Sequence, residues 1–222
     1  MYMQGLANFI DDFLGGLILI AYALVVGTLF WRAFVLRSVQ GQPNGGEGSQ
    51  IAALGVLRFG AKSLAVMQGT KLVMKGLVLW GVLGELPLAD YFSTVQFQAG
   101  LARMVLSTLI FWQTNALLRD PKIKDAWRNI YLLAIPLVAA GAWLVHAVGR
   151  FENRESLMLL TLAHQVAAAI WFGGVAQLLS LWRLGSRDEE ARKLWPLAVV
   201  RFGTLGIFAV ALLLLTGLPM AL

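Results

Sequence analysis

The sequence predicts an all-α fold, a single polytopic membrane bundle of about six transmembrane helices that spans residues 1–222 as one domain. Three observations predict it: 59% of the residues are hydrophobic, only 14% are charged, and the mean hydropathy is +0.72. Soluble domains are roughly a quarter charged, and a helix needs about 20 apolar residues to cross a bilayer. The composition therefore excludes an ordinary soluble globule.

Six apolar stretches are close to this length, and each is predicted to be one membrane span. They cover residues 13–36, 60–84, 98–118, 130–149, 157–182 and 197–219. The connections between them are short, so we expect no appended soluble domain. The Gly-, Pro- and Asn-rich segment 41–49 is predicted to be a flexible linker because of its composition.

The distribution of Lys and Arg predicts the orientation of the bundle, because cytoplasmic loops hold an excess of positive charge. One side of the alternating connections holds thirteen of the 18 basic residues: Arg32, Arg37, Arg58, Lys62, Arg119, Lys122, Lys124, Arg128, Arg183, Arg187, Arg192, Lys193 and Arg201. The other side holds only Arg150 and Arg154. Both termini are therefore predicted to face outward, and the net charge of +6 is assigned to topology rather than to nucleic-acid binding.

Three basic residues lie inside predicted spans, namely Lys71, Lys75 and Arg103. Such a charge costs about 2.5 to 3.5 kcal/mol at the centre of a membrane helix. Each side chain is therefore expected to face a water-filled cavity, to pair with a carboxylate or to reach the membrane interface. Gln68, Lys71 and Lys75 follow i, i+3, i+7 spacing and share one helical stripe. This stripe has two interpretations: a polar lining of an internal path, or snorkelling combined with polar helix packing.

The two histidines, His146 and His164, lie in consecutive spans. An antiparallel pair of helices places both imidazoles in the outer half at similar depth. The chain has no Cys, and neutral imidazole binds Cu, Zn, Fe and Ni, while thioethers favour Cu(I). His146 and His164 are therefore the predicted metal ligands, and copper is the predicted metal.

Four methionines are candidate additional ligands: Met67, Met74, Met104 and Met158. Two alternatives stay open, because a membrane-embedded His can act as a metal-free interhelical hydrogen-bonding group, and methionines in an apolar bundle commonly serve packing. Ala169 and Gly173, one turn apart on the fifth span, predict a close crossing with a neighbouring helix whether or not a metal binds.

Four short motifs occur in order along the chain: STVQFQAGLAR at 93–103, HA at 146–147, HQVAAAIWFGGVAQLLSLW at 164–182 and VRFGTLGIFAVALLLLTGL at 200–218. Together they resemble the copper resistance protein D (CopD) family of bacterial inner-membrane proteins. The third motif is the best match, being similar to the family's His-x-x-x-Ala-Ala-x-Trp-x-Gly-Gly segment. The chain departs from the family at Ala21-Tyr22, where members often carry a His, and in its six spans against about eight.

The resemblance implies a multi-pass protein of the bacterial inner membrane, with both termini in the periplasm and a periplasm-facing copper site at His146 and His164. Its implied function is to move copper across the membrane or to pass it to a partner. The implied partners are the lipid bilayer, a periplasmic copper carrier or other membrane subunits, and no nucleic acid.

Two other functions remain open at this point. The departures favour a metal-free accessory subunit of a larger membrane complex, such as a copper enzyme. The same two histidines could instead ligate haem b in a bis-histidine b-type cytochrome. An enzyme is not expected, because the spans carry no nucleophile with a base, no paired carboxylates and no phosphate-binding loop.

Overall fold

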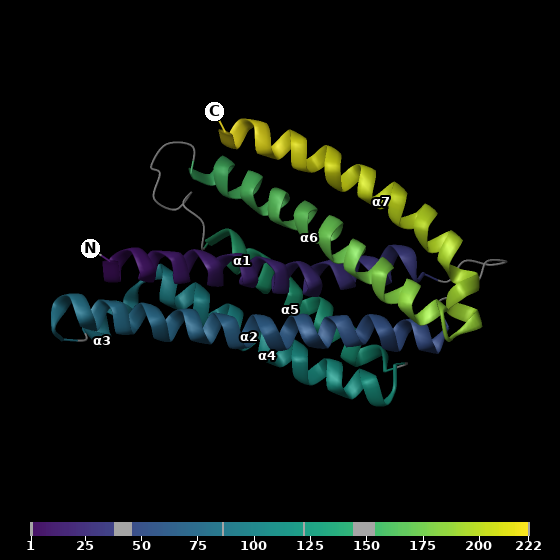
Figure 1. Ribbon diagram of the computed structural model, residues 1–222, viewed down its shortest axis with the longest axis horizontal. Helices are drawn as coiled ribbons and strands as arrows, with labels where there is room; N and C mark the ends of the chain where they lie inside the picture. Colours follow the sequence, from purple (N-terminus) through teal and green to yellow (C-terminus); the bar gives the residue numbers. More distant parts are fainter. Residues whose placement is uncertain (1, 38–45, 86, 122, 144–153, 222) are drawn as a thin grey trace.

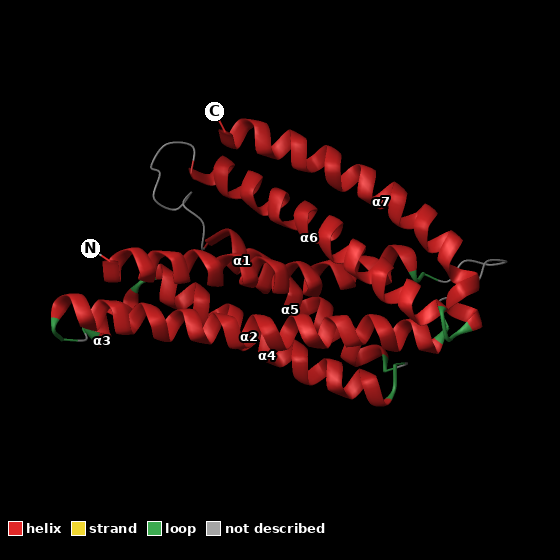
Figure 2. Ribbon diagram, viewed as in Figure 1, coloured by secondary structure: helices red, strands yellow, loops and turns green. Residues whose placement is uncertain are grey.

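The structure, a computed structural model, describes residues 2–37, 46–85, 87–121, 123–143 and 154–221, and these residues form helices and their connections, with no strand among them (Figures 1 and 2). Helix α1 spans Tyr2–Phe30 and continues as the π-helical turn η1 over Trp31–Val35. The remaining helices are α2 (Glu47–Leu83), α3 (Leu88–Ser93), α4 (Val95–Arg119), α5 (Lys124–Trp143), α6 (Arg154–Gly185) and α7 (Glu189–Ala221).

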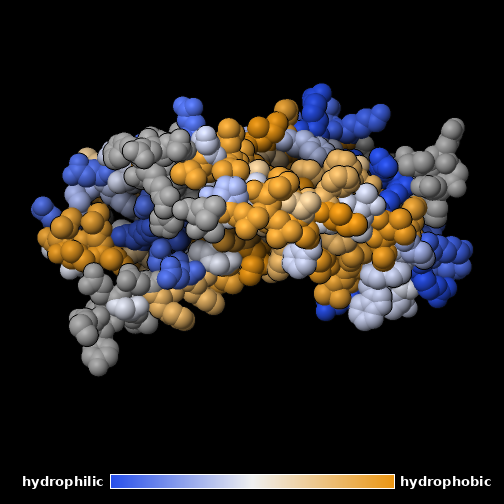
Figure 3. Space-filling model, turned by 90° about the horizontal axis from the view of Figure 1, so that it is seen from above, coloured by the Kyte–Doolittle hydropathy of each residue, from blue (hydrophilic) through white to orange (hydrophobic). Residues whose placement is uncertain are grey.

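Four helical segments are long and apolar enough to cross a membrane: Phe9–Val35, Glu47–Leu83, Glu155–Gly185 and Glu189–Pro219. They indicate a membrane-embedded protein and confirm the predicted helical bundle. Hydrophobic residues form a broad band around the middle of the molecule, with charged residues gathered towards its ends (Figure 3). Helices α4 and α5 fall on the predicted stretches 98–118 and 130–149 but are less apolar than these four segments.

Two local predictions need correction. Residues 41–45 of the predicted linker 41–49 lie outside the described residues, but Glu47, Gly48 and Ser49 belong to the first turn of α2 rather than to a linker. Gly46 precedes this turn as its N-cap, and the acidic Glu47 suits the positive end of the helix dipole. The short helix α3 between α2 and α4 was not expected. It begins after Pro87, and Thr94 then caps α4 by accepting a hydrogen bond from the backbone N–H of Phe97 at 3.2 Å.

The helices pack as a closed circuit with one helix outside it. Helix α1 packs on α2, α2 on α4, α4 on α5, α5 on α6, and α6 returns to α1, while α7 packs against α6 and η1. Both ends of the described chain lie at the end of the bundle that also holds α3, and the turns between α4 and α5 and between α6 and α7 lie at the opposite end (Figure 1). Residues 21–29 of α1 are buried without a break, and α2 also contacts α6, so the interior of the bundle lies around α1.

Helix α6 packs closely against α1 and α7. A Cβ on Gly173 would overlap the carbonyl oxygen of Ala23 on α1 and would lie 2.8 Å from the Cα of Gly27. On the other side of the helix, Phe202 of α7 fills the space in front of Gly174. The small-residue face predicted at Ala169 and Gly173 is therefore confirmed as a tight crossing, and its partner is α1 of the same chain.

Candidate functional site

His164 lies at the interface between α6 and α7, outside the interior of the circuit. Its Nδ1 is 3.0 Å from the hydroxyl oxygen of Thr216, and the missing side chain of Gly217 leaves room for the imidazole, whose Cε1 would be 3.5 Å from a Cβ there. In the sequence, Thr216 and Gly217 appeared only as the Thr-Gly pair of the last motif. The linear sequence does not show that this pair contacts His164.

The hydrogen bonds of Thr216 hold the imidazole of His164 in one orientation. The Thr216 hydroxyl donates to the carbonyl of Leu212 at 2.6 Å, one turn earlier in α7. Its oxygen can then accept from the imidazole in the tautomer that carries the proton on Nδ1. In that tautomer Nε2 keeps its lone pair, which is how outer-shell hydrogen bonds orient ligating imidazoles.

No cluster of metal-ligating carboxylates and imidazoles occurs among the described residues. They contain no group of three or more His, Asp or Glu side chains suited to a metal ion. His146 falls within 144–153, outside the described residues, so the predicted pairing of the two imidazoles is not placed. Met104 lies elsewhere: its sulfur would be 3.1 Å from a Cβ at Gly69 on α2, and Met67 packs against the main hydrophobic core.

A second group of polar side chains lies inside the circuit. Arg103 on α4 is only 5% exposed, and its guanidinium carbon lies 5.3 Å from the ring centre of Tyr22 on α1, which is 2% exposed. Neither the Nε of Arg103 nor the hydroxyl of Tyr22 has a hydrogen-bond partner. Arg103 makes no ion pair with any carboxylate in the part of the chain that the structure describes. From the sequence, Arg103 was a candidate because a charged side chain within a membrane span costs free energy. Tyr22 was noted only as a departure from the pattern of the CopD family.

Two glutamines and two glycines complete this polar group. Gln68 on α2 is 3% exposed, its Oε1 has no partner, and its Nε2 would lie 2.8 Å from a Cβ at Gly100 on α4. Gly141 on α5 makes the same kind of space, because a Cβ there would lie 2.8 Å from Oε1 of Gln165 on α6 and 4.0 Å from Cε2 of Tyr22. Glycine at both positions lets these polar side chains fit between the helices.

The lysines of the second predicted span do not join this group. Lys71 Nζ lies 3.2 Å from the carboxylate of Asp11 on α1, and Lys75 Nζ lies 3.9 Å from the same oxygen. Lys75 also donates to Oε1 of Gln96 at 3.1 Å. Among the two interpretations of the stripe, polar packing therefore describes Lys71 and Lys75, whereas Gln68 alone faces the interior.

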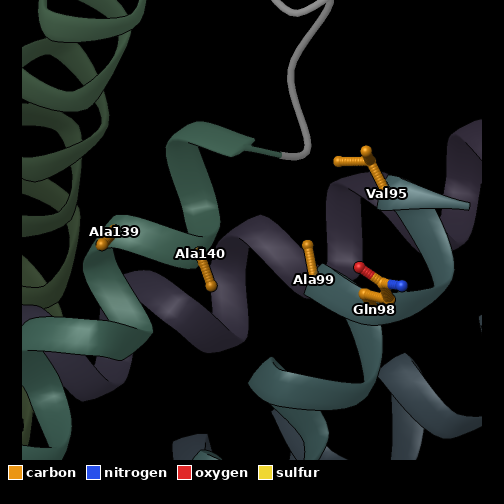
Figure 4. A pocket seen from close by; sticks show the side chains of 5 residues that line it. All are labelled: Val95, Gln98, Ala99, Ala139 and Ala140. Atoms are coloured by element: carbon orange, nitrogen blue, oxygen red, sulfur yellow. The ribbon is translucent and has the colours of Figure 1, made fainter.

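A cavity of about 350 Å³ lies between the start of α4 and the end of α5 (Figure 4). It is lined by Val95, Gln98 and Ala99 of α4 and by Ala139 and Ala140 of α5. Ala99 directly precedes Gly100 and lies one turn before Arg103, and Ala140 directly precedes Gly141. The cavity therefore adjoins the two helix segments that face the buried polar group.

The fold and these polar groups define the class of the molecule as a membrane-embedded helical bundle with ionisable side chains placed inside it. Comparison of the chain with protein-family models, with curated proteins and with solved structures finds no match. The likeness to the copper resistance protein D family rests on the short motifs described above.

Proposed function

We propose that this protein handles copper in the bacterial inner membrane, binding it through His164 and His146 on the periplasmic side. The observation that carries the proposal is the contact of 3.0 Å between Nδ1 of His164 and the hydroxyl oxygen of Thr216, which orients the imidazole. Neutral imidazole with the second nitrogen hydrogen-bonded is the usual form of a histidine metal ligand. Copper is the cargo that a periplasmic carrier delivers and that the protein moves inward or passes to another membrane subunit.

The proposal includes the finer topology. Six spans with both termini in the periplasm agree with the charge distribution, and both ends of the described chain lie at one end of the bundle (Figure 1). His164 lies about 15 Å from the start of α6, at a rise of 1.5 Å per residue, and α6 starts at the end of the bundle that holds both termini. The imidazole is then in the periplasmic half of the bundle.

Copper binding by purified protein tests the proposal, with copper stoichiometry and affinity measured for His164→Ala, His146→Ala and the double variant. We expect each single variant to lose most binding, because one imidazole with weak remaining ligands lacks donor strength and geometry. Thr216→Val is the sharper probe: it keeps the imidazole and removes only the group that orients it, so the affinity should fall about 10- to 100-fold.

Three outcomes contradict the proposal. Wild-type copper content in the double variant would exclude the two histidines as the copper ligands. A Soret band in the purified protein would favour the b-type cytochrome. A protein without copper that co-purifies with other membrane chains would favour the accessory subunit. Val200→Ala, at an exposed position of α7, is the matched control that should leave copper binding unchanged.

A further inference from the structure

The buried polar group of Tyr22, Gln68 and Arg103 has unsatisfied hydrogen-bonding capacity at its centre. Each of the three side chains is more than nine-tenths buried, and each carries a nitrogen or oxygen atom without a partner. Natural proteins satisfy the large majority of such atoms, so an exception calls for an explanation. Two of these atoms, Nε of Arg103 and the hydroxyl of Tyr22, can donate to a bound acceptor, whereas Oε1 of Gln68 is itself an acceptor. The two donors, on α4 and α1, point to an acceptor from outside the described residues.

The charge of Arg103 identifies the chemistry of that group. A guanidinium stays protonated in proteins, so the interior holds a positive charge with no carboxylate paired to it among the described residues. The ring of Tyr22 supplies a cation–π contact at 5.3 Å, which is weaker than a full counter-ion. Water could satisfy hydrogen bonds at this place but would leave the charge unbalanced. An anion does both.

We infer that Tyr22, Gln68 and Arg103 form a binding site for a small oxyanion, a carboxylate or phosphate group. The planar guanidinium fork matches two oxygens of such a group, and the Tyr22 hydroxyl can donate to a third acceptor position. The Nε2 of Gln68, directed at Gly100, supplies a further donor on the same side of α4. The inference does not depend on copper binding at His164, which lies on the other side of α6.

We place the entry to this site at the cavity between α4 and α5, which Ala99 and Ala140 line (Figure 4). Helix side chains lean towards the N-terminus of their helix, so Arg103 leans over the turn that holds Ala99 and Gly100. The chain neighbours Gly100 and Gly141 lie close to Gln68 and Gln165. Small side chains at these positions leave the space that an incoming oxyanion needs.

Thermal unfolding of the full-length protein in a neutral detergent tests the inference, with sodium acetate or sodium phosphate compared with sodium chloride at equal ionic strength. We expect acetate or phosphate to raise the melting temperature of the wild-type protein in a saturable way, since a ligand that binds only the folded state stabilises it. Arg103→Gln should abolish the rise. Arg58→Gln, which removes an exposed arginine of α2, should keep it.

Two gentler variants cover the case in which Arg103→Gln does not fold. Arg103→Lys keeps the charge but loses the fork, and Tyr22→Phe loses only the hydroxyl. Each should weaken oxyanion binding about tenfold, the effect expected for one hydrogen bond to a charged group. A purely structural Tyr22 would leave the oxyanion affinity unchanged in Tyr22→Phe.

Lipid nanodiscs distinguish the two sources of the oxyanion. If the group is a lipid headgroup, phosphatidylglycerol should stabilise the wild-type protein more than phosphatidylcholine does, and Arg103→Gln should lose that difference. If the group is a soluble anion, the two lipids should act alike and the effect of acetate or phosphate should persist. An absence of any Arg103-dependent stabilisation by acetate, phosphate and phosphatidylglycerol would overturn the inference.

Discussion

The two sides of the bundle differ in how they treat buried polar groups. Where α6 meets α1 and α7, Gln177 donates to the hydroxyl of Thr28 at 2.6 Å, Thr28 donates to the carbonyl of Leu24, and Nδ1 of His164 lies in hydrogen-bond contact with the hydroxyl of Thr216. On the side of α4, the atoms of Arg103 and its neighbours described above lack partners. Satisfied polar contacts stabilise one arrangement of helices, whereas the unsatisfied ones cost stability until something binds. The satisfied contacts of α6 therefore belong to the structural scaffold, whereas the unsatisfied atoms around Arg103 mark the candidate binding site.

The largest effect is expected where the satisfied side is most closely packed. Gly173→Ala places a methyl group against the Ala23 carbonyl and Gly27, so α6 must move away from α1. We expect a loss of about 1 to 3 kcal/mol, typical of overpacking, measured as the free energy of unfolding in detergent. Gly203→Ala is the matched control, because a Cβ there meets nothing within 4 Å. Equal stability of the two variants would show that the crossing is loose.

The unsatisfied side should respond in the opposite direction. Arg103→Met replaces an unpaired buried charge with an apolar side chain of similar length. Replacing buried ion pairs by apolar residues is neutral or stabilising by about 1 to 4 kcal/mol, and we expect the lower end of that range here, about 1 kcal/mol. In chloride buffer without added oxyanion, we therefore expect a higher melting temperature than that of the wild type. A lower melting temperature would mean that the charge already has a partner, and the contrast between the two sides would fail.

A smaller effect is expected at the α6–α7 interface. Thr216→Val removes the acceptor of His164 Nδ1 and keeps the shape of the side chain. A polar contact between membrane helices contributes about 1 kcal/mol, so the free energy of unfolding should fall by about that amount. Thr204→Val, which removes an exposed hydroxyl on the same helix, is the control and should change little. A loss several times larger would indicate that this contact holds α7 in place.

The smallest effect is expected at the lysines of α2. Asp11→Asn removes the carboxylate that contacts Lys71 and Lys75, but the Asp11 side chain is 39% exposed. Ion pairs accessible to solvent contribute up to about 1 kcal/mol, and added salt should reduce the difference between variant and wild type. A loss that persists in high salt would show that this pair is shielded from water and belongs with the buried polar groups.

Much of the fold could be predicted because membrane helices follow from local composition. The predicted stretches overlap α1, α2, α4, α5, α6 and α7, and the spacing of Ala169 and Gly173 predicted a close crossing that the structure confirms. Arg103 could also be singled out from the sequence, because a charged side chain within a span is costly. Helix α3 and the early start of α2 were missed, because α3 has only six residues and the first turn of α2 is polar.

The candidate sites could be predicted only in part, since a site needs residues from several helices. The sequence named His164 but not Thr216, and it named Arg103 and Gln68 but not Tyr22. Whether the predicted ligand His146 accompanies His164 stays a prediction, because His146 lies outside the described residues. The residues that come into contact between two helices depend on how each helix is rotated about its axis and how far it is shifted along the other. The spacing of residues within one helix does not determine either quantity.

Taken by itself, the sequence determined that the chain forms apolar helices, that its basic residues lie mostly in alternate connections, and that a few costly polar residues lie within the helices. These properties follow from each segment alone, through its length, composition and period. Tertiary structure decided that Lys71 pairs with Asp11 while Arg103 pairs with no carboxylate of the described ranges, and that His164 faces α7 rather than the interior. Those outcomes depend on contacts between distant segments, which arise only when the helices pack.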